Sequence, residues 1–322
     1  MSSTSKMKIL FVTTKDPRAQ GDFLEVGLLH GLRSVLGSSC IDFPRKKVMY
    51  HDWSETSKEE LHGRGFTLYS QPIEELSQSE REMKDIDYVL YGVTNAYGSQ
   101  EYDKINSLVG QDRVWHLDGH DLYGHAPRMI TFGGEIVIGV QKVPCFKREL
   151  TENIPGALPI GFGIPKDQIR GLNFSGKSQL FQKTAPHHAA FKEFKDLGDA
   201  RAHHVFTVEA DYYDDLQKSW FGLTCKKGGW DCLRHYEIIA AGALLLFRDY
   251  NKKPNLCSPR ELPCHSYASK EELAELISRL VVNNKPTNEY LDMLFSQRQW
   301  LYSTGTTEAR ALSVLRTLSD IK

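Results

Sequence analysis

Short apolar runs, several of them apolar throughout, alternate with polar or helical stretches along the first half of the chain. Runs that are apolar throughout, rather than alternating, are typical of parallel strands that are covered on both faces. The pattern therefore predicts an open α/β sheet. Its strands are expected at residues 8–13, 65–69, 86–91, 113–117, 135–139 and 157–160.

The first of these strands leads through a polar loop into an amphipathic helix. In the stretch FLEVGLLHGLRSVLG the apolar residues recur at helical spacing. Asp22 stands where an N-cap is expected, and Gly37 marks the C-terminal stop. Strand, loop and helix together make half of a βαβ unit.

A second α/β pattern follows a stretch rich in Gly, Pro and Ser, residues 161–179, which is the expected linker. Two domains are therefore predicted, residues 1–165 and 166–322. In the second, strands are expected at 203–207, 220–224 and 243–247, and helices around 187–198, at 211–219, 233–241 and 269–284, and in the tail to Lys322. Ser269 is the expected N-cap of the helix that it begins.

The composition narrows the class of protein. The 322 residues are 40% apolar and 25% charged, as in ordinary globular proteins, and the formal net charge of -1 gives no field to recruit nucleic acid or anionic membrane. No run reaches the roughly 18 apolar residues that span a bilayer, and the start fits a strand better than a signal peptide. The six cysteines form no C-x-x-C pair and are spaced too widely for usual zinc pairs, so a cytoplasmic protein with reduced thiols is expected.

The segment KKGGWDCLRHYEIIAAGALLLF, residues 226–247, gathers cations, a Gly-Gly turn and a carboxylate before a buried element. A turn that includes Gly229 exposes backbone N–H groups at a helix start, where the dipole favours an anion. Lys226, Lys227 and Arg234 add charges suited to phosphate oxygens. Glu237 lies one turn beyond Arg234 and can accept hydrogen bonds from a ribose diol. The segment therefore describes a nucleotide-diphosphate site.

Two features of this segment allow another interpretation. Arg234 and Glu237 also fit an i, i+3 ion pair on a solvated helix face. Asp231 can cap the helix itself, and its negative charge repels phosphate.

The order S-x-F-G-L-T…K-x-G-G-W-D-x-x-R-x-Y-E-I-I-A-A-G-A-L-L-L-F resembles the C-terminal domain of GT-B glycosyltransferases, in particular the CgeB-like and family-4-like groups. The resemblance covers roughly residues 210–280 and implies two Rossmann-like domains, with the donor on the second and the acceptor on the first. It makes Glu237 the ribose binder and Arg234 a donor-site residue. Tyr236, which stands between them in the motif, is a candidate substrate-binding residue. It also implies a nucleotide sugar and an acceptor glycan or glycoconjugate as partners, with no resident cofactor or metal.

Candidate acid–base residues lie outside this motif. Asp22 opens the first helix, the region in which the resemblance places an acceptor-activating base, although it fits a simple N-cap equally well. The end of the predicted strand 113–117 and the loop after it hold His116, Asp118, His120 and Asp121. Asp118 and Asp121 are candidate bases and His120 a candidate acceptor contact, but the same loop also fits local hydrogen bonding or the metal site of a hydrolase. A non-catalytic nucleotide-sugar binding module is a further alternative.

A basic pair, Lys147 and Arg148, stands just before the expected linker. It fits either a phosphate contact in the cleft or a solvated helix start, and the nearby hinge-like segment favours the cleft. Lys177 belongs to a G-K-S triplet without the upstream glycine spacing of a P-loop, so an NTPase is not expected.

Overall fold

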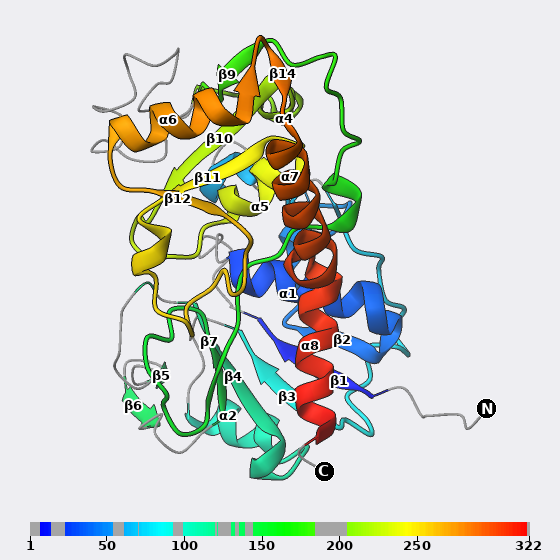
Figure 1. Ribbon diagram of the computed structural model, residues 1–322. Helices are drawn as coiled ribbons and strands as arrows, with labels where there is room; N and C mark the ends of the chain where they lie inside the picture. The colour runs from blue at the N-terminus through cyan, green and yellow to red at the C-terminus, as the bar shows by residue number, and fades with distance from the viewer. Residues whose placement is uncertain are drawn as a thin grey trace, which may run out of the picture.

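Two parallel β-sheets organise the protein in a computed structural model, which describes residues 7–13, 23–53, 61–69, 71–92, 99–119, 121, 130–132, 135–138, 144–183 and 205–320 (Figure 1). The predicted α/β class is confirmed, and both sheets are parallel as in Rossmann-like folds. The six-stranded sheet has the order β2-β1-β3-β4-β7-β8, with β1 (Ile9–Val12), β2 (Cys40–Phe43), β3 (Tyr88–Tyr91), β4 (Val114–Asp118), β7 (Cys145–Lys147) and β8 (Ala157–Pro159). The four-stranded sheet has the order β12-β11-β10-β9, with β9 (Gln179–Phe181), β10 (Ser219–Cys225), β11 (Leu244–Arg248) and β12 (His265–Tyr267).

Helices cover these sheets, and most of those predicted within the described residues are confirmed. The helix expected before Gly37 is α1, and it ends where Gly37 takes φ +60°. The predicted N-cap of α6 is confirmed, because Ser269 Oγ accepts a hydrogen bond of 3.1 Å from Glu272 N–H. The helices are α1 (Phe23–Leu36), α2 (Ser99–Asn106), α4 (Glu209–Lys218), α5 (Leu233–Ala240), α6 (Lys270–Leu280), α7 (Asn288–Trp300) and α8 (Thr307–Asp320).

Three predicted strands differ from the structure. Residues 65–69 form no strand, because Gly65 and Thr67 take positive φ and the chain turns there, although its apolar side chains are buried. The run 135–139 pairs antiparallel in a small hairpin, β5 (Ile130–Phe132) with β6 (Glu135–Ile138), outside the large sheets. Residues 205–207 are not in a strand, while the rest of that prediction, and the helix expected around 187–198, lie outside the described residues.

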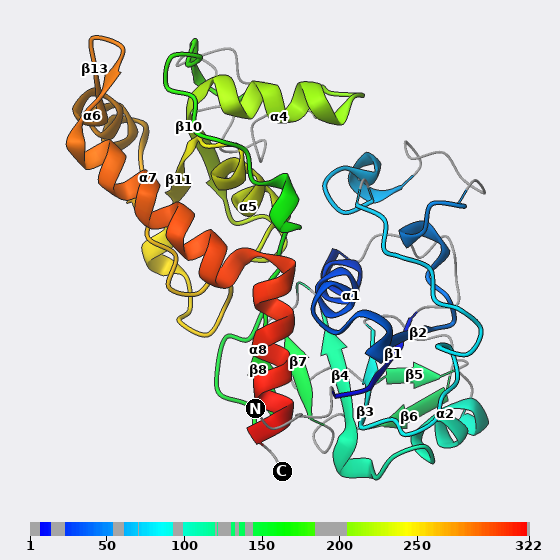
Figure 2. The ribbon, with the colours of Figure 1, turned by 90° about the vertical axis from the view of Figure 1, so that its right-hand side faces the viewer.

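The last helix returns to the first sheet (Figure 2). The chain leaves the second half through α7 and a π-helical turn (Leu301–Gly305), and α8 then lies along α1. Tyr88 OH in β3 donates a 2.6 Å hydrogen bond to Leu318 O, and His30 Nδ1 lies 2.9 Å from Thr307 Oγ1. A Cβ at Gly31 would lie 2.0 Å from Thr307 O, so the close approach of α1 and α8 requires glycine there.

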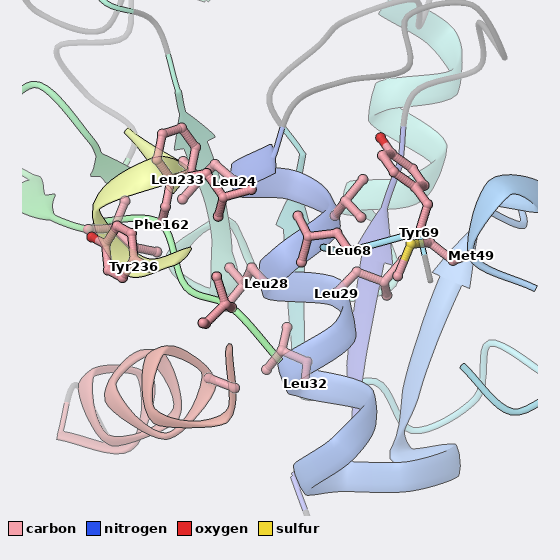
Figure 3. Packing of buried hydrophobic residues seen from close by; sticks show 14 of the residues in the cluster. Leu24, Leu28, Leu29, Leu32, Met49, Leu68, Tyr69, Phe162, Leu233 and Tyr236 are labelled. Atoms are coloured by element: carbon pink, nitrogen blue, oxygen red, sulfur yellow. The ribbon is translucent and has the colours of Figure 1, made fainter. Parts of the chain in front are cut away.

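Helix α1 packs against both halves of the molecule (Figure 3). Its residues Leu29 and Leu32 belong to the same buried cluster as Leu68, and Leu24 and Leu28 to the same cluster as Leu233 of α5. One continuous core therefore joins the two sheets.

All six cysteines are free thiols. Within the described residues, no helix is both long enough and apolar enough to span a membrane.

Candidate functional site

A pocket of about 510 Å³ lies between the two halves of the chain. Asp121 lies beyond β4, Arg148 beyond β7, and the turn 226–232 beyond β10. These are the carboxyl ends of parallel strands, which is where open α/β sheets bind ligands. The first half also contributes aromatic side chains to the wall, and the second half contributes Tyr212, residues 227–229 and 231–234, and Glu237.

The segment singled out in the sequence forms the wall on the side of the second sheet. Strand β10, the turn and helix α5 follow each other as predicted, and α5 begins after Cys232 with no side-chain cap. Asp231 does not cap this helix, because its carboxylate accepts hydrogen bonds from Phe162 N–H at 2.7 Å and from Tyr236 OH at 2.9 Å. The start of α5 therefore faces the pocket without a capping carboxylate.

Two of the predicted cations of this segment line the pocket and donate no side-chain hydrogen bond to the described part of the protein. Among the described residues, no group accepts a hydrogen bond from the ammonium of Lys227 or the guanidinium of Arg234. Lys227 is exposed and Arg234 is half-buried. Lys226 is placed differently, with Nζ 5.5 Å from the ring centroid of Trp230. The open charges on this side are thus those of Lys227 and Arg234.

Glu237 also lines the pocket, but its carboxylate is already bonded to two hydroxyl groups. Thr67 Oγ1 donates to Oε1 at 2.5 Å, and Tyr212 OH donates to Oε2 at 2.6 Å. Glu237 is only 7% exposed, and this burial raises its pKa, against the lowering by the two hydroxyl donors and by Arg234. It forms no ion pair with Arg234 on a solvated face, so the i, i+3 alternative does not describe the structure.

Arg148 connects the two halves of the chain. It is buried, and it donates to Gly119 O at 3.0 Å, to Glu149 Oε1 at 3.2 Å, to Asp231 O at 2.8 Å and to Asp121. The guanidinium therefore contacts the pocket, but its donors are taken by protein acceptors.

Lys147 is likewise paired. It is buried at the end of β7, and its Nζ lies 2.8 Å from Asp118 Oδ2 at the end of β4. Lys147 and Arg148 thus belong to neither a solvated helix start nor a set of open phosphate-binding cations.

The carboxylate of Glu149 packs against the Gly-Gly turn. Gly229 is buried, and a Cβ there would lie 2.3 Å from Glu149 Oε1. The same oxygen accepts a 2.9 Å hydrogen bond from Asp231 N–H, and Lys227 N–H donates to Gly229 O at 3.1 Å. Some of the N–H groups expected to face a ligand are therefore used within the protein.

The candidate bases are separated by the structure. Asp118 is buried against Lys147, whereas Asp121 is exposed, lines the pocket and pairs with Arg148. Asp22 and His120 lie outside the described residues, although Phe23, next to Asp22, lines the pocket.

His116 is buried in β4, and its ring stacks on that of Tyr91 with centroids 4.9 Å apart. Burial lowers the pKa of His116 to about 3. Among the described residues no three His, Cys, Asp or Glu side chains are grouped to hold a metal ion.

Tyr236 lies in the core and not in the pocket wall. It is fully buried, and its ring lies 5.5 Å from that of Trp300. Its hydroxyl donates to Asp231 and accepts from Arg310 at 3.3 Å. The structure thus places Tyr236 as a packing and hydrogen-bonding residue on the buried side of α5.

Three residues at the site were not singled out from the sequence: Thr67, Tyr212 and Glu149. Thr67 sits in a run that predicted a strand, and Tyr212 in a polar helix, so neither carried a local signal for a site. Glu149 follows the basic pair directly, and its position beside two cations was the one available indication.

Comparison of the chain with protein-family models gives no match, and neither does comparison with curated protein sequences.

Proposed function

We propose that the protein is a glycosyltransferase that moves a sugar from a nucleotide-diphosphate sugar to an acceptor hydroxyl. The observation that carries the proposal is the pair of pocket cations, Lys227 and Arg234, which have no hydrogen-bonded partner among the described residues. Positive charge at the start of α5 favours an anionic ligand, and an ammonium and a guanidinium that line the same pocket suit diphosphate oxygens. Glu237, one turn further along α5, is the proposed acceptor of ribose hydroxyls.

The arrangement of the sheets supports a GT-B enzyme. The pocket lies beyond the carboxyl ends of strands from two parallel sheets, so a donor on the second half can meet an acceptor on the first. The aromatic side chains of Phe23, Phe66 and Phe162 on the first half offer a wall for the acceptor.

The transfer forms a bond between the acceptor oxygen and the anomeric carbon of the donor sugar. The bond from that carbon to the diphosphate breaks, and the nucleoside diphosphate leaves with the electron pair. Lys227, Arg234 and the α5 dipole stabilise the charge on the leaving diphosphate, so the proposal assigns no resident metal or cofactor. The acceptor proton passes to a carboxylate in an inverting reaction, for which Asp121 is the described candidate that lines the pocket.

Binding of nucleoside diphosphates tests the donor site. UDP, GDP, ADP and dTDP are compared by thermal shift in chelator and again with Mg²⁺ or Mn²⁺, and the best ligand is then measured by calorimetry. Lys227→Gln and Arg234→Gln are each expected to weaken binding about tenfold to a hundredfold, because each removes a charge-assisted contact. Lys285→Gln, an exposed lysine outside the pocket wall, is the matched control and should bind as the wild type does.

Turnover separates an enzyme from a binding module. Release of nucleoside diphosphate from the preferred nucleotide sugar, measured with candidate glycan acceptors, should fall about 10²–10⁴-fold in Asp121→Asn if this residue is the base. Binding without any release would favour the non-catalytic module. Stabilisation by zinc or manganese alone, with none by any nucleotide, would point to the metal-dependent hydrolase at residues 116–121 instead.

A further inference from the structure

A turn from the first half of the chain reaches across to Glu237. Within this turn, residues 61–69, Thr67 is fully buried. Its N–H donates to Glu209 Oε1 at 2.7 Å, and its carbonyl accepts from Gln168 Nε2 at 3.4 Å. Its Oγ1 lies 2.9 Å from Tyr213 OH and 2.5 Å from Glu237 Oε1. Thr67 is thus held by groups of the second half of the chain.

The hydroxyls on Glu237 reproduce the pattern that a diol would make. Thr67 Oγ1 donates to one carboxylate oxygen and Tyr212 OH to the other, at 2.5 and 2.6 Å. Two adjacent hydroxyls of a ribose bind a carboxylate with the same donor pattern, one hydroxyl on each oxygen. Because Glu237 is almost completely buried, little of its surface is left for a further donor.

We propose that Thr67 is an internal competitor of the ligand, whose hydroxyl occupies the place on Glu237 that a ligand hydroxyl takes. The inference rests on the proposed donor site. A ribose hydroxyl that binds Glu237 Oε1 must displace the Thr67 hydroxyl, and its neighbour on Oε2 must displace that of Tyr212. The protein therefore binds its donor more weakly than an open carboxylate would. A ligand must therefore carry a diol to bind Glu237, since a ligand without hydroxyls has no donor to replace that of Thr67.

The backbone of the turn is suited to such an exchange. Gly63, Arg64, Gly65 and Thr67 have φ of 60°, 58°, 68° and 73°. A positive φ is strained for a β-branched residue such as Thr67, so its contacts hold it in a conformation that it would leave when released. The buried side chains of Phe66 and Leu68, on either side of Thr67, anchor the turn in the core, which limits the movement to Thr67 itself.

Two substitutions at one position separate the hydroxyl from the shape of the side chain. Thr67→Val keeps the β-branched shape and removes the hydroxyl, whereas Thr67→Ser keeps the hydroxyl. Calorimetry is performed with whichever of UDP, GDP and ADP stabilises the wild type most, and with its 2′,3′-dideoxy analogue. Thr67→Val is expected to bind the ribonucleotide about threefold to tenfold more tightly, because Glu237 then lacks an internal donor that the ribose supplies. Thr67→Ser should bind it within about twofold of the wild type, and the dideoxy analogue should not distinguish the proteins.

Every other outcome contradicts the proposal that Thr67 competes with the ligand. Weaker or unchanged ribonucleotide binding by Thr67→Val would make Thr67 a support that positions Glu237. An equal gain for ribonucleotide and dideoxy analogue would show that the hydroxyls are not what Thr67 competes with. Thr67→Ala, whose side chain is smaller, repeats the measurement if the valine variant does not fold. If no nucleotide binds the wild type or any variant, both the proposed donor site and the proposed role of Thr67 are wrong. If nucleotides bind but Thr67→Val binds them no more tightly, only the proposed role of Thr67 is wrong.

Discussion

Replacement of Arg148 by methionine tests whether the junction between the halves depends on one buried guanidinium. Arg148→Met keeps most of the aliphatic volume and removes every donor. The half-buried Gly119 O and the buried Asp231 O lose hydrogen bonds of 3.0 and 2.8 Å. Glu149, which is 0% exposed, loses the cation 3.2 Å from its Oε1. A buried charge left without its partner typically costs about 3–5 kcal/mol of unfolding free energy, and that is the expected loss.

The loss should depend on pH in a direction that the structure fixes. Burial raises the pKa of Glu149, and Arg148 is among the groups that lower it. Without Arg148 the folded-state pKa rises further above the unfolded value, so the folded state of the variant binds the proton more readily. A raised carboxyl pKa gives stability at low pH that is lost as the pH rises through the folded pKa. Arg148→Met should therefore be closer to the wild type at pH 5 than at pH 8.

Urea unfolding followed by circular dichroism measures the free energy at both values of pH, with an unchanged m value as the condition for comparison. Arg170→Met is the control, because Arg170 pairs with the exposed Asp214 and its removal should cost about 1 kcal/mol or less. Arg148→Met combined with Glu149→Gln should recover part of the loss, since residue 149 then carries no buried charge that has lost its cation. A loss below about 1 kcal/mol for Arg148→Met, or one that does not vary with pH, would show that the junction does not depend on this guanidinium.

Two further predictions concern packing and titration. Gly31→Ala should lower the unfolding free energy by about 1–3 kcal/mol in the same urea assay, although alanine favours helix, because its Cβ would lie 2.0 Å from Thr307 O. Gly171→Ala is the control and should change little, since a Cβ there would have nothing within 4 Å. A Gly31→Ala variant as stable as the wild type would contradict the close contact. The pKa of His116 is lowered by burial to about 3 from 6.5, so the unfolded chain binds its proton first and stability falls as the pH drops from about 6.5 towards 3. His116→Phe keeps the stacking on Tyr91 and removes the titrating ring. It should reduce the slope of unfolding free energy against pH by about 1.4 kcal/mol per pH unit between about pH 6 and 4. An unchanged slope would show that His116 is not the group that titrates.

The elements that the sequence predicted well are those with local signals. Strand β10, helix α5 and strand β11 follow from one segment, whose apolar run, glycines and periodicity all lie within about 30 residues. The turn at 65–69 failed for the opposite reason, since its apolar side chains are buried by partners distant in sequence while its backbone turns at Thr67. Charge was harder still to interpret. The residue types of Arg148 and Arg234 are the same, and only the fold shows that Arg148 meets Asp231 across 83 residues while Arg234 stays open to the pocket.

The return of α8 to α1 has a consequence for synthesis. On the ribosome, α1 is made about 270 residues before the helix that covers it. Until then, the face of α1 around Gly31 and the hydroxyl of Tyr88 lack their final partners. The N-terminal sheet therefore cannot reach its finished state as a vectorially folded unit, and the second sheet must be made before the first is complete. Pairing of such distant segments slows folding and prolongs the exposure of apolar surface, so the nascent chain should depend on holding chaperones for most of its translation.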